Sequence, residues 1–154
     1  MKRILPLIFL LMCETSYSQS KSQTAQWNVD PKSHLALSGY DPVAYFKDAK
    51  AVKGQASIAA EYEGVRYQFA SAAHKELFQK SPALFEPQYG GWCAYAMGAK
   101  GEKVEIDPET FKILDGKLYL FYNRFFNNTL DTWNKNEAEL KANADKNWVK
   151  LTNQ

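Results

Sequence analysis

The chain has 154 residues, a hydrophobic fraction of 45%, an aromatic fraction of 14% and a formal net charge of +2. A length and composition of this kind are typical of one domain with a substantial core, and they exclude fibrous and intrinsically disordered proteins. Lysine and glutamate residues are interspersed and form no basic block. This charge pattern argues against nucleic acid as a partner.

The first residues have the pattern of a secretory signal peptide. A positively charged start (1–3) precedes the uncharged apolar run 4–13, and small residues stand before a predicted cleavage point after Ser18. The apolar run is too short to span a bilayer, and no other stretch reaches the ~20 residues that a span needs. We therefore predict a signal peptide over 1–18, export to the periplasm or the extracellular space, and no membrane span.

Cleavage after Ser18 would also remove Cys13 and leave Cys93 as the sole cysteine. The formal charge would fall from +2 to +1, because Lys2, Arg3 and Glu14 are lost. An alternative is a lipoprotein anchored through Cys13, which the bulky neighbouring methionine disfavours. In either case Cys93 has no partner for an intramolecular disulfide, although exported proteins are in an oxidising compartment.

The segment 19–34 is polar, and we expect a leader that packs loosely apart from Trp27. The domain itself is predicted over 35–151. Asp41 directly precedes a proline, which predicts a short helix over 42–46 with Asp41 as its cap.

Alternating aromatic and polar residues over 61–71 predict a β-hairpin that turns at Glu63-Gly64. Ser71 is then expected to cap a helix that runs to about Lys80. The prolines that follow end this helix and make 81–90 a loop.

The segment 111–123 is the clearest strand pair, because Asp115-Gly116 stands between two apolar runs. From Asn123 onward the spacing of apolar residues predicts two C-terminal helices. We expect an α+β fold, with a small antiparallel sheet of two hairpins covered by helices. The apolar positions assigned to the first C-terminal helix are Phe125, Phe126, Leu130 and Trp133.

Four segments together resemble the YHS domain family, and more narrowly its secreted, single-domain branch. They are GYDPVAYF (39–46), EYEGVRYQFAS (61–71), SPALFEPQYGGWCAYA (81–96) and DGKLYLFYN (115–123). The resemblance runs from about residue 35 to residue 151.

The resemblance implies a domain suspected of binding metal, since YHS domains occur beside heavy-metal-transporting ATPases and in some multicomponent oxygenases. The form found with those ATPases carries cysteines where this chain has Ala44 and Ala70. The most obvious thiolate pair is therefore missing, and Cys93 belongs to the YGG-x-CA motif of the secreted branch.

Cys93, Met97 and His74 are the candidate metal ligands. If a helix starts near Trp92, Cys93 lies in its first turn and Met97 follows one turn later on the same face. A thiolate beside a thioether suits a soft ion, copper(I) above all. His74 is the preferred third ligand, and His34 is the chain's other imidazole.

Three hypotheses about function remain open, and the third, a redox or peroxide-sensing use of the lone thiol, requires that Cys93 is exposed and reactive. One is an exported, non-enzymatic YHS domain that binds a soft metal ion, such as copper, or another small ligand near Cys93. The alternative is a structural or protein-interaction module in which Cys93 packs in the core, where free cysteines are common. Catalysis by Cys93 would need an adjacent base and an orienting group, for which the motifs offer no pattern. The glycine pair 90–91 lacks the residues of a phosphate loop.

Overall fold

The computed structural model describes residues 25–153. The predicted signal peptide and Cys13 lie outside the described residues. Between residues 25 and 153, no helix has the length and apolar character required to cross a membrane.

The segment that leads into the domain is hydrogen-bonded to it. The backbone N–H of Asn28 donates to the carbonyl oxygen of Gly90 at 2.8 Å, and the indole N–H of Trp92 donates to the carbonyl oxygen of Gln26 at 2.7 Å. Trp27 packs against the core, as expected. The described part of the leader is thus held by more than this one tryptophan.

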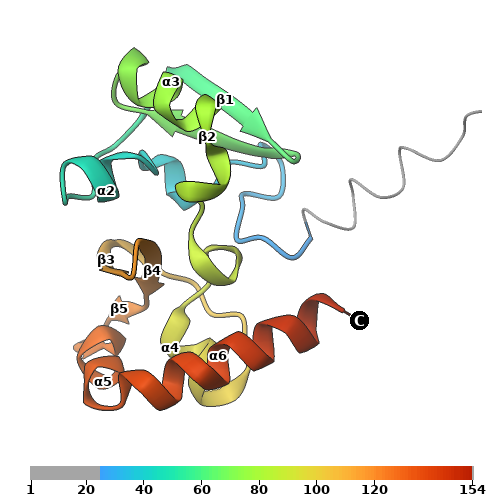
Figure 1. Cartoon of the computed structure of the whole chain (residues 1–154), viewed down its shortest axis with the longest axis vertical. Helices are drawn as coiled ribbons and strands as arrows, with labels where there is room; N and C mark the ends of the chain where they lie inside the picture. The colour runs from blue at the N-terminus through green and yellow to red at the C-terminus, as the bar shows by residue number, and fades with distance from the viewer. Residues whose placement is uncertain (1–24, 154) are drawn as a thin grey trace, which may run out of the picture.

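The upper half of the molecule in Figure 1 contains the first hairpin and the helices around it. A 3-10 turn, η1 (Leu37–Gly39), precedes the short helix α2 (Ala44–Lys47). Strands β1 (Gln55–Tyr62) and β2 (Val65–Phe69) follow, and α3 (Ala72–Lys80) packs on them.

Two 3-10 turns, η2 (Pro82–Leu84) and η3 (Gln88–Gly91), lead the chain into the lower half (Figure 1). This half contains α4 (Ala94–Lys100) and the hairpin of β3 (Asp107–Leu114) and β4 (Lys117–Phe121). It ends with the small strands β5 (Asn123–Arg124) and β6 (Asn127–Asn128), and with the helices α5 (Thr129–Lys135) and α6 (Glu137–Thr152).

The α+β class is confirmed, but the sheet differs from the one expected. The strands form three separate two-stranded antiparallel sheets, β1–β2, β3–β4 and β5–β6, instead of one sheet of two hairpins. The first two hairpins are not paired with each other. An isolated bridge between Pro87 and Leu118 links β4 to the loop that joins them. Side-chain packing therefore joins the hairpins.

Local signals in the sequence are confirmed where they involve turns and caps. The hairpins turn at Glu63-Gly64 and Asp115-Gly116, as predicted. The side chain of Ser71 accepts a hydrogen bond from the backbone N–H of His74 at 3.1 Å and caps α3. Asp41 accepts from the N–H groups of Val43 and Ala44, but the helix that follows spans Ala44–Lys47 and not the predicted 42–46.

The helical prediction from Asn123 onward is wrong for the first six residues. Residues 123–128 form the β5–β6 hairpin, and α5 begins only at Thr129, where the side chain of Asn128 accepts from the N–H of Leu130 at 3.1 Å. Two C-terminal helices do follow. Phe125 and Phe126 are therefore not part of a buried helical face.

Two hydrophobic clusters form the core. The first joins the halves of the molecule, since it combines residues of β2 and α3 with residues of β4, and the second lies between α4, β4, α5 and α6. The largest fully buried members of the first cluster are Tyr45, Tyr67, Phe69, Phe78, Leu118 and Leu120. The second contains Tyr89, Met97, Tyr119, Phe121, Trp133 and Ala144, among others.

Candidate functional site

Cys93 is the N-cap residue of α4 and is fully buried. The expectation that it lies inside the first turn is therefore wrong by one residue. Its sulfur does not bond back to the helix. Instead, the Sγ atom accepts a hydrogen bond from the backbone N–H of Tyr122 at 3.3 Å, and it lies 3.5 Å from the hydroxyl of Thr129.

The direction of the bond between Cys93 and Thr129 follows from the third member of this group. The Thr129 hydroxyl donates its single hydrogen to the carbonyl oxygen of Tyr122 at 2.8 Å. The thiol must therefore donate to the oxygen of Thr129 while it accepts from Tyr122. This arrangement satisfies the thiol and fastens the start of α4 to the chain that follows β4.

A cleft of about 240 Å³ includes Cys93 in its lining. Because the thiol is fully buried, it lies beneath the surface that the cleft exposes. The walls combine two aromatic rings with small apolar side chains, one ammonium group, one carboxylate and one amide. The lining residues are Cys93, Tyr95, Ala96, Ala99, Lys100, Glu102, Val104, Tyr122, Asn127 and Thr129.

Met97 lies on α4 with Cys93 at its cap, and its backbone N–H donates to the carbonyl oxygen of Cys93 at 3.0 Å. The side chains belong to different packing environments, however. Cys93 is in the first core cluster and Met97 is fully buried in the second, against residues such as Trp133. Met97 is also not part of the lining of the cleft.

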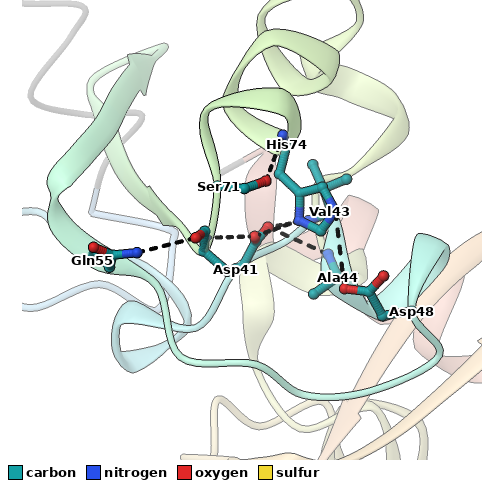
Figure 2. A network of polar contacts seen from close by, with 8 residues as sticks. Asp41, Val43, Ala44, Asp48, Gln55, Ser71 and His74 are labelled. Atoms are coloured by element: carbon teal, nitrogen blue, oxygen red, sulfur yellow. Dashed lines mark hydrogen bonds and ion pairs between the residues drawn. The ribbon is translucent and has the colours of Figure 1, made fainter.

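His74 lies in the upper half of the molecule, on α3, and its ring is held by two carboxylates (Figure 2). Its Nδ1 atom is 2.7 Å from Oδ2 of Asp41, and its Nε2 atom is 3.9 Å from Oδ2 of Asp48. The ring partners of His74 are thus distinct from the partners of the Cys93 sulfur. The structure does not bring His74 to the cleft.

Asp41 is fully buried and accepts four hydrogen bonds. Its Oδ1 atom accepts from Val43 and Ala44 at 2.8 and 3.3 Å, and its Oδ2 atom from the N–H of Ala70 at 2.8 Å and from His74. The sequence predicted only the capping role. The pairing with His74 depends on the β1–β2 hairpin, which brings α3 back over α2, and no spacing in the sequence signals it.

These positions bear on the metal site proposed from the sequence. Within residues 25–153, no three His, Cys, Asp or Glu side chains are grouped so that they could hold a metal ion. His34, the alternative imidazole, is exposed, and its backbone carbonyl accepts from the N–H of Arg66 at 2.9 Å. The donor set Cys93, Met97 and His74 therefore does not form a preassembled three-ligand site.

A larger cleft of about 480 Å³ lies beside the leading segment, and the sequence offered no signal for it. The segments that border it are far apart in the chain, so only the fold brings them together. Its lining residues are Asn28, Val29, Asp30, Pro31, Ser33, Leu35, Leu37, Ser38, Gly91, Glu105 and Ile106.

Glu86 is a partly buried carboxyl group whose pKa is raised to about 7 from its ordinary value of 4.5. Burial is the main cause, and the negative charge of Glu63 adds to it. The hydroxyl of Tyr67 donates to Glu86 at 3.4 Å and partly opposes the rise. The same burial raises the pKa of Tyr67.

The raised pKa of Glu86 predicts a pH-dependent stability. The folded protein holds the proton on Glu86 more tightly than the unfolded chain does. The contribution of this proton to stability is therefore fully present below about pH 4.5 and is lost as the pH rises toward about 7. Glu86→Gln should be about 1 kcal/mol more stable than wild type at alkaline pH, a value reduced from the full linkage because the side chain is partly exposed. Urea unfolding under acidic and alkaline conditions measures this difference.

The Glu109→Gln variant is the matched control for Glu86→Gln, because it makes the same substitution at an exposed side chain. If Glu86→Gln shows the same difference from wild type at both pH values, the carboxyl group is not protonated on folding.

Comparison with known proteins does not test the resemblance to the YHS family. No family model, no curated protein and no solved structure matches this chain.

Proposed function

We propose that the protein is an exported, non-enzymatic domain of the YHS type that binds a small ligand in the cleft over Cys93. One observation carries this proposal: the single free thiol of the described chain adjoins a cleft whose lining also offers aromatic, cationic and anionic groups. Concave sites with apolar walls and a few polar groups are the usual form of small-ligand sites.

The cleft limits the chemistry of the ligand. Its volume of about 240 Å³ is below the range of roughly 300–1,000 Å³ that holds drug-sized molecules, so the ligand has only a few heavy atoms. Tyr95 and Tyr122 provide flat apolar contacts, while Lys100 and Glu102 provide opposite charges. A small polar molecule with one planar or apolar side fits this lining.

In a second form of the proposal, the ligand is a soft metal ion such as copper(I). Cys93 is the only soft donor in the lining of the cleft, since Met97 and His74 lie outside it. An ion would need further ligands beyond those the fold has assembled there. The residues present therefore favour a small molecule over a metal ion alone.

The non-enzymatic part of the proposal rests on the partners of the thiol. Nucleophilic catalysis by cysteine requires a base within hydrogen-bond reach of the sulfur. The hydrogen-bond partners of Cys93 are a backbone N–H and the Thr129 hydroxyl, neither of which is a base of that kind.

The cleft can be tested by filling it. Ala99 is exposed and lines the cleft, so Ala99→Trp should block it without disturbing the core. We expect small polar aromatic fragments to shift the NMR signals of the lining residues in wild type and not in Ala99→Trp. Ala73→Trp places the same side chain at an exposed position on α3 and should retain the shifts. Shifts that persist in Ala99→Trp, or their absence in wild type, would refute the site.

Copper(I) titration under reducing conditions separates the two forms of the proposal. Binding by wild type that is lost in Cys93→Ser assigns the ion to the thiol. Equal binding in both proteins excludes Cys93 as its ligand.

The alternative function is a structural or interaction module in which Cys93 only packs. The satisfied hydrogen bonds of the thiol support it. We expect Cys93→Ala to lower the free energy of unfolding by about 1–2 kcal/mol, because a small cavity forms and the N–H of Tyr122 loses its acceptor. Cys93→Ser keeps an acceptor and should lose less, as measured by urea unfolding. If Cys93→Ala leaves both stability and fragment binding unchanged, the thiol has neither role.

A further inference from the structure

The β5–β6 hairpin exposes two adjacent aromatic rings at its tip. Arg124 pairs with Asn127, so Phe125 and Phe126 are the two residues of the turn. Their side chains are 89% and 110% exposed. Values this high mean that the rings project from the surface and make almost no contact with the rest of the described chain.

The backbone conformation of this turn is unfavourable for phenylalanine. Phe125 and Phe126 have φ values of 53° and 62°, and positive φ at both central residues defines a type I′ turn, which favours Asn-Gly or Asp-Gly. A bulky side chain in the left-handed region is strained. Within the described fold, the strained turn and the exposed rings therefore make no evident contribution to stability.

The other two hairpins of the chain show what such a turn normally contains. Glu63-Gly64 has φ values of 49° and 79°, and Asp115-Gly116 has 50° and 71°. Both use glycine at the second position, where a side chain is most strained. The third turn has the same backbone with two phenylalanines, and strain of this kind is typical of a functional position.

The exposed area distinguishes between kinds of partner. Two phenylalanine side chains offer roughly 150–250 Å² each, whereas a stable protein interface buries about 800 Å² on each partner. The residues that flank the tip, Arg124 and Asn127, are exposed and polar, so the apolar area does not extend beyond the rings. Such a tip is too small for a stable protein interface. It suits insertion into a lipid interface, where Phe, Trp and Leu side chains are buried at the boundary between headgroups and acyl chains.

We propose that the Phe125–Phe126 tip inserts into the surface of a phospholipid membrane, with Arg124 pairing with a lipid phosphate. The guanidinium group of Arg124 matches the charge and geometry of a phosphate. Zwitterionic lipids also carry a phosphate, but only anionic lipids give the membrane a net negative surface that attracts the charge of Arg124, so anionic lipids should strengthen binding. The contact is peripheral and reversible, because a short apolar tip holds a protein only weakly at a membrane.

Vesicle flotation tests this proposal on protein that lacks residues 1–18, whose apolar run would itself bind lipid. Wild type should float with vesicles of phosphatidylcholine and phosphatidylglycerol, and less with phosphatidylcholine alone. The double variant Phe125→Asn/Phe126→Gly should lose about tenfold or more of this binding, since both apolar side chains are gone. Arg124→Gln should keep residual binding but lose the preference for the anionic lipid.

The melting temperature of the same double variant separates loss of the two rings from unfolding as the cause of weaker binding. Asn-Gly is the preferred type I′ sequence, so the variant should have a higher melting temperature than wild type. Leu84→Ser, which removes an exposed apolar side chain elsewhere (66% exposed), is the matched control and should bind as wild type does.

Three results would overturn the proposal. The first is wild type that remains unbound at every vesicle composition, and the second is a double variant that floats as well as wild type. Self-association of wild type that depends on Phe125 and Phe126, without vesicle binding, would assign the tip to a second copy of the chain instead. The assay does not depend on the Cys93 cleft, so Ala99→Trp should float normally.

Discussion

Replacing Asp41 with alanine should lower the free energy of unfolding by about 3–5 kcal/mol, because several donors lose one buried carboxylate acceptor at once, at roughly 1–3 kcal/mol for each group left unpaired. The carboxylate is fully buried and its two oxygens serve four donors. Without it, the N–H groups of Val43 and Ala70 lose their acceptor in a buried site, and His74 loses its main partner (Figure 2).

Asp48→Ala is the matched control for Asp41→Ala. It removes the second carboxylate near His74, but that group is half-exposed and 3.9 Å from the ring. The expected change is within about 1 kcal/mol, as for other surface ion pairs. Urea unfolding of both variants gives the comparison. Equal losses would show that the buried network around Asp41 adds nothing beyond a surface pair.

Replacing Gly98 with alanine should cost about 2–3 kcal/mol, in the upper part of the usual cost of roughly 1–3 kcal/mol for overpacking a core. A Cβ atom at this position would lie 2.4 Å from the carbonyl oxygen of Leu140 and 3.0 Å from its carbonyl carbon. Both are backbone atoms of α6, so no side chain can move aside, and α4 and α6 must separate. The higher helix propensity of alanine recovers only about 1 kcal/mol of this penalty, which the stated range already includes.

Gly116→Ala separates close packing from backbone conformation. Gly116 has a φ of 71° and nothing within 4 Å of the position of an added Cβ atom. Its replacement should cost about 1–2 kcal/mol through the left-handed conformation alone. Thermal and urea unfolding of the two variants provide the measurement. If Gly98→Ala is as stable as wild type, the contact between α4 and α6 is not a tight one.

Much of the local structure could be predicted because its causes lie within a few residues. Asp41 before a proline, Ser71 before α3 and the Asp115-Gly116 turn each act on neighbouring backbone groups. The apolar runs on either side of Asp115-Gly116 also located the second hairpin, although its first strand begins at Asp107 and not at 111. These features do not depend on contacts with distant parts of the chain.

The prediction failed where apolar spacing had two physical explanations. Phe125 and Phe126, read together with Leu130 and Trp133, fit one face of a helix. In the structure Trp133 is fully buried on α5, but the two phenylalanines form a hairpin tip. Spacing alone cannot tell an apolar residue that enters a core from one that leaves it.

Some features of the candidate site could likewise be predicted from the sequence, and others depend on the fold. The sequence by itself determined that Cys93 is the only cysteine of the described chain, and it located the start of the following helix to within about two residues. Which atoms surround the sulfur was decided by the tertiary structure, because Tyr122 and Thr129 reach it only when the chain after β4 folds against α4.

The pairing of His74 with Asp41, and its distance from the Cys93 cleft, are likewise properties of the fold. Hydrogen bonds between residues 33 positions apart depend on how hairpins and helices pack, and no short pattern encodes that. The sequence alone therefore determined caps, turns and the single thiol, whose causes are local. The tertiary structure decided which of the candidate ligands meet, because contacts between distant segments exist only after the core has formed.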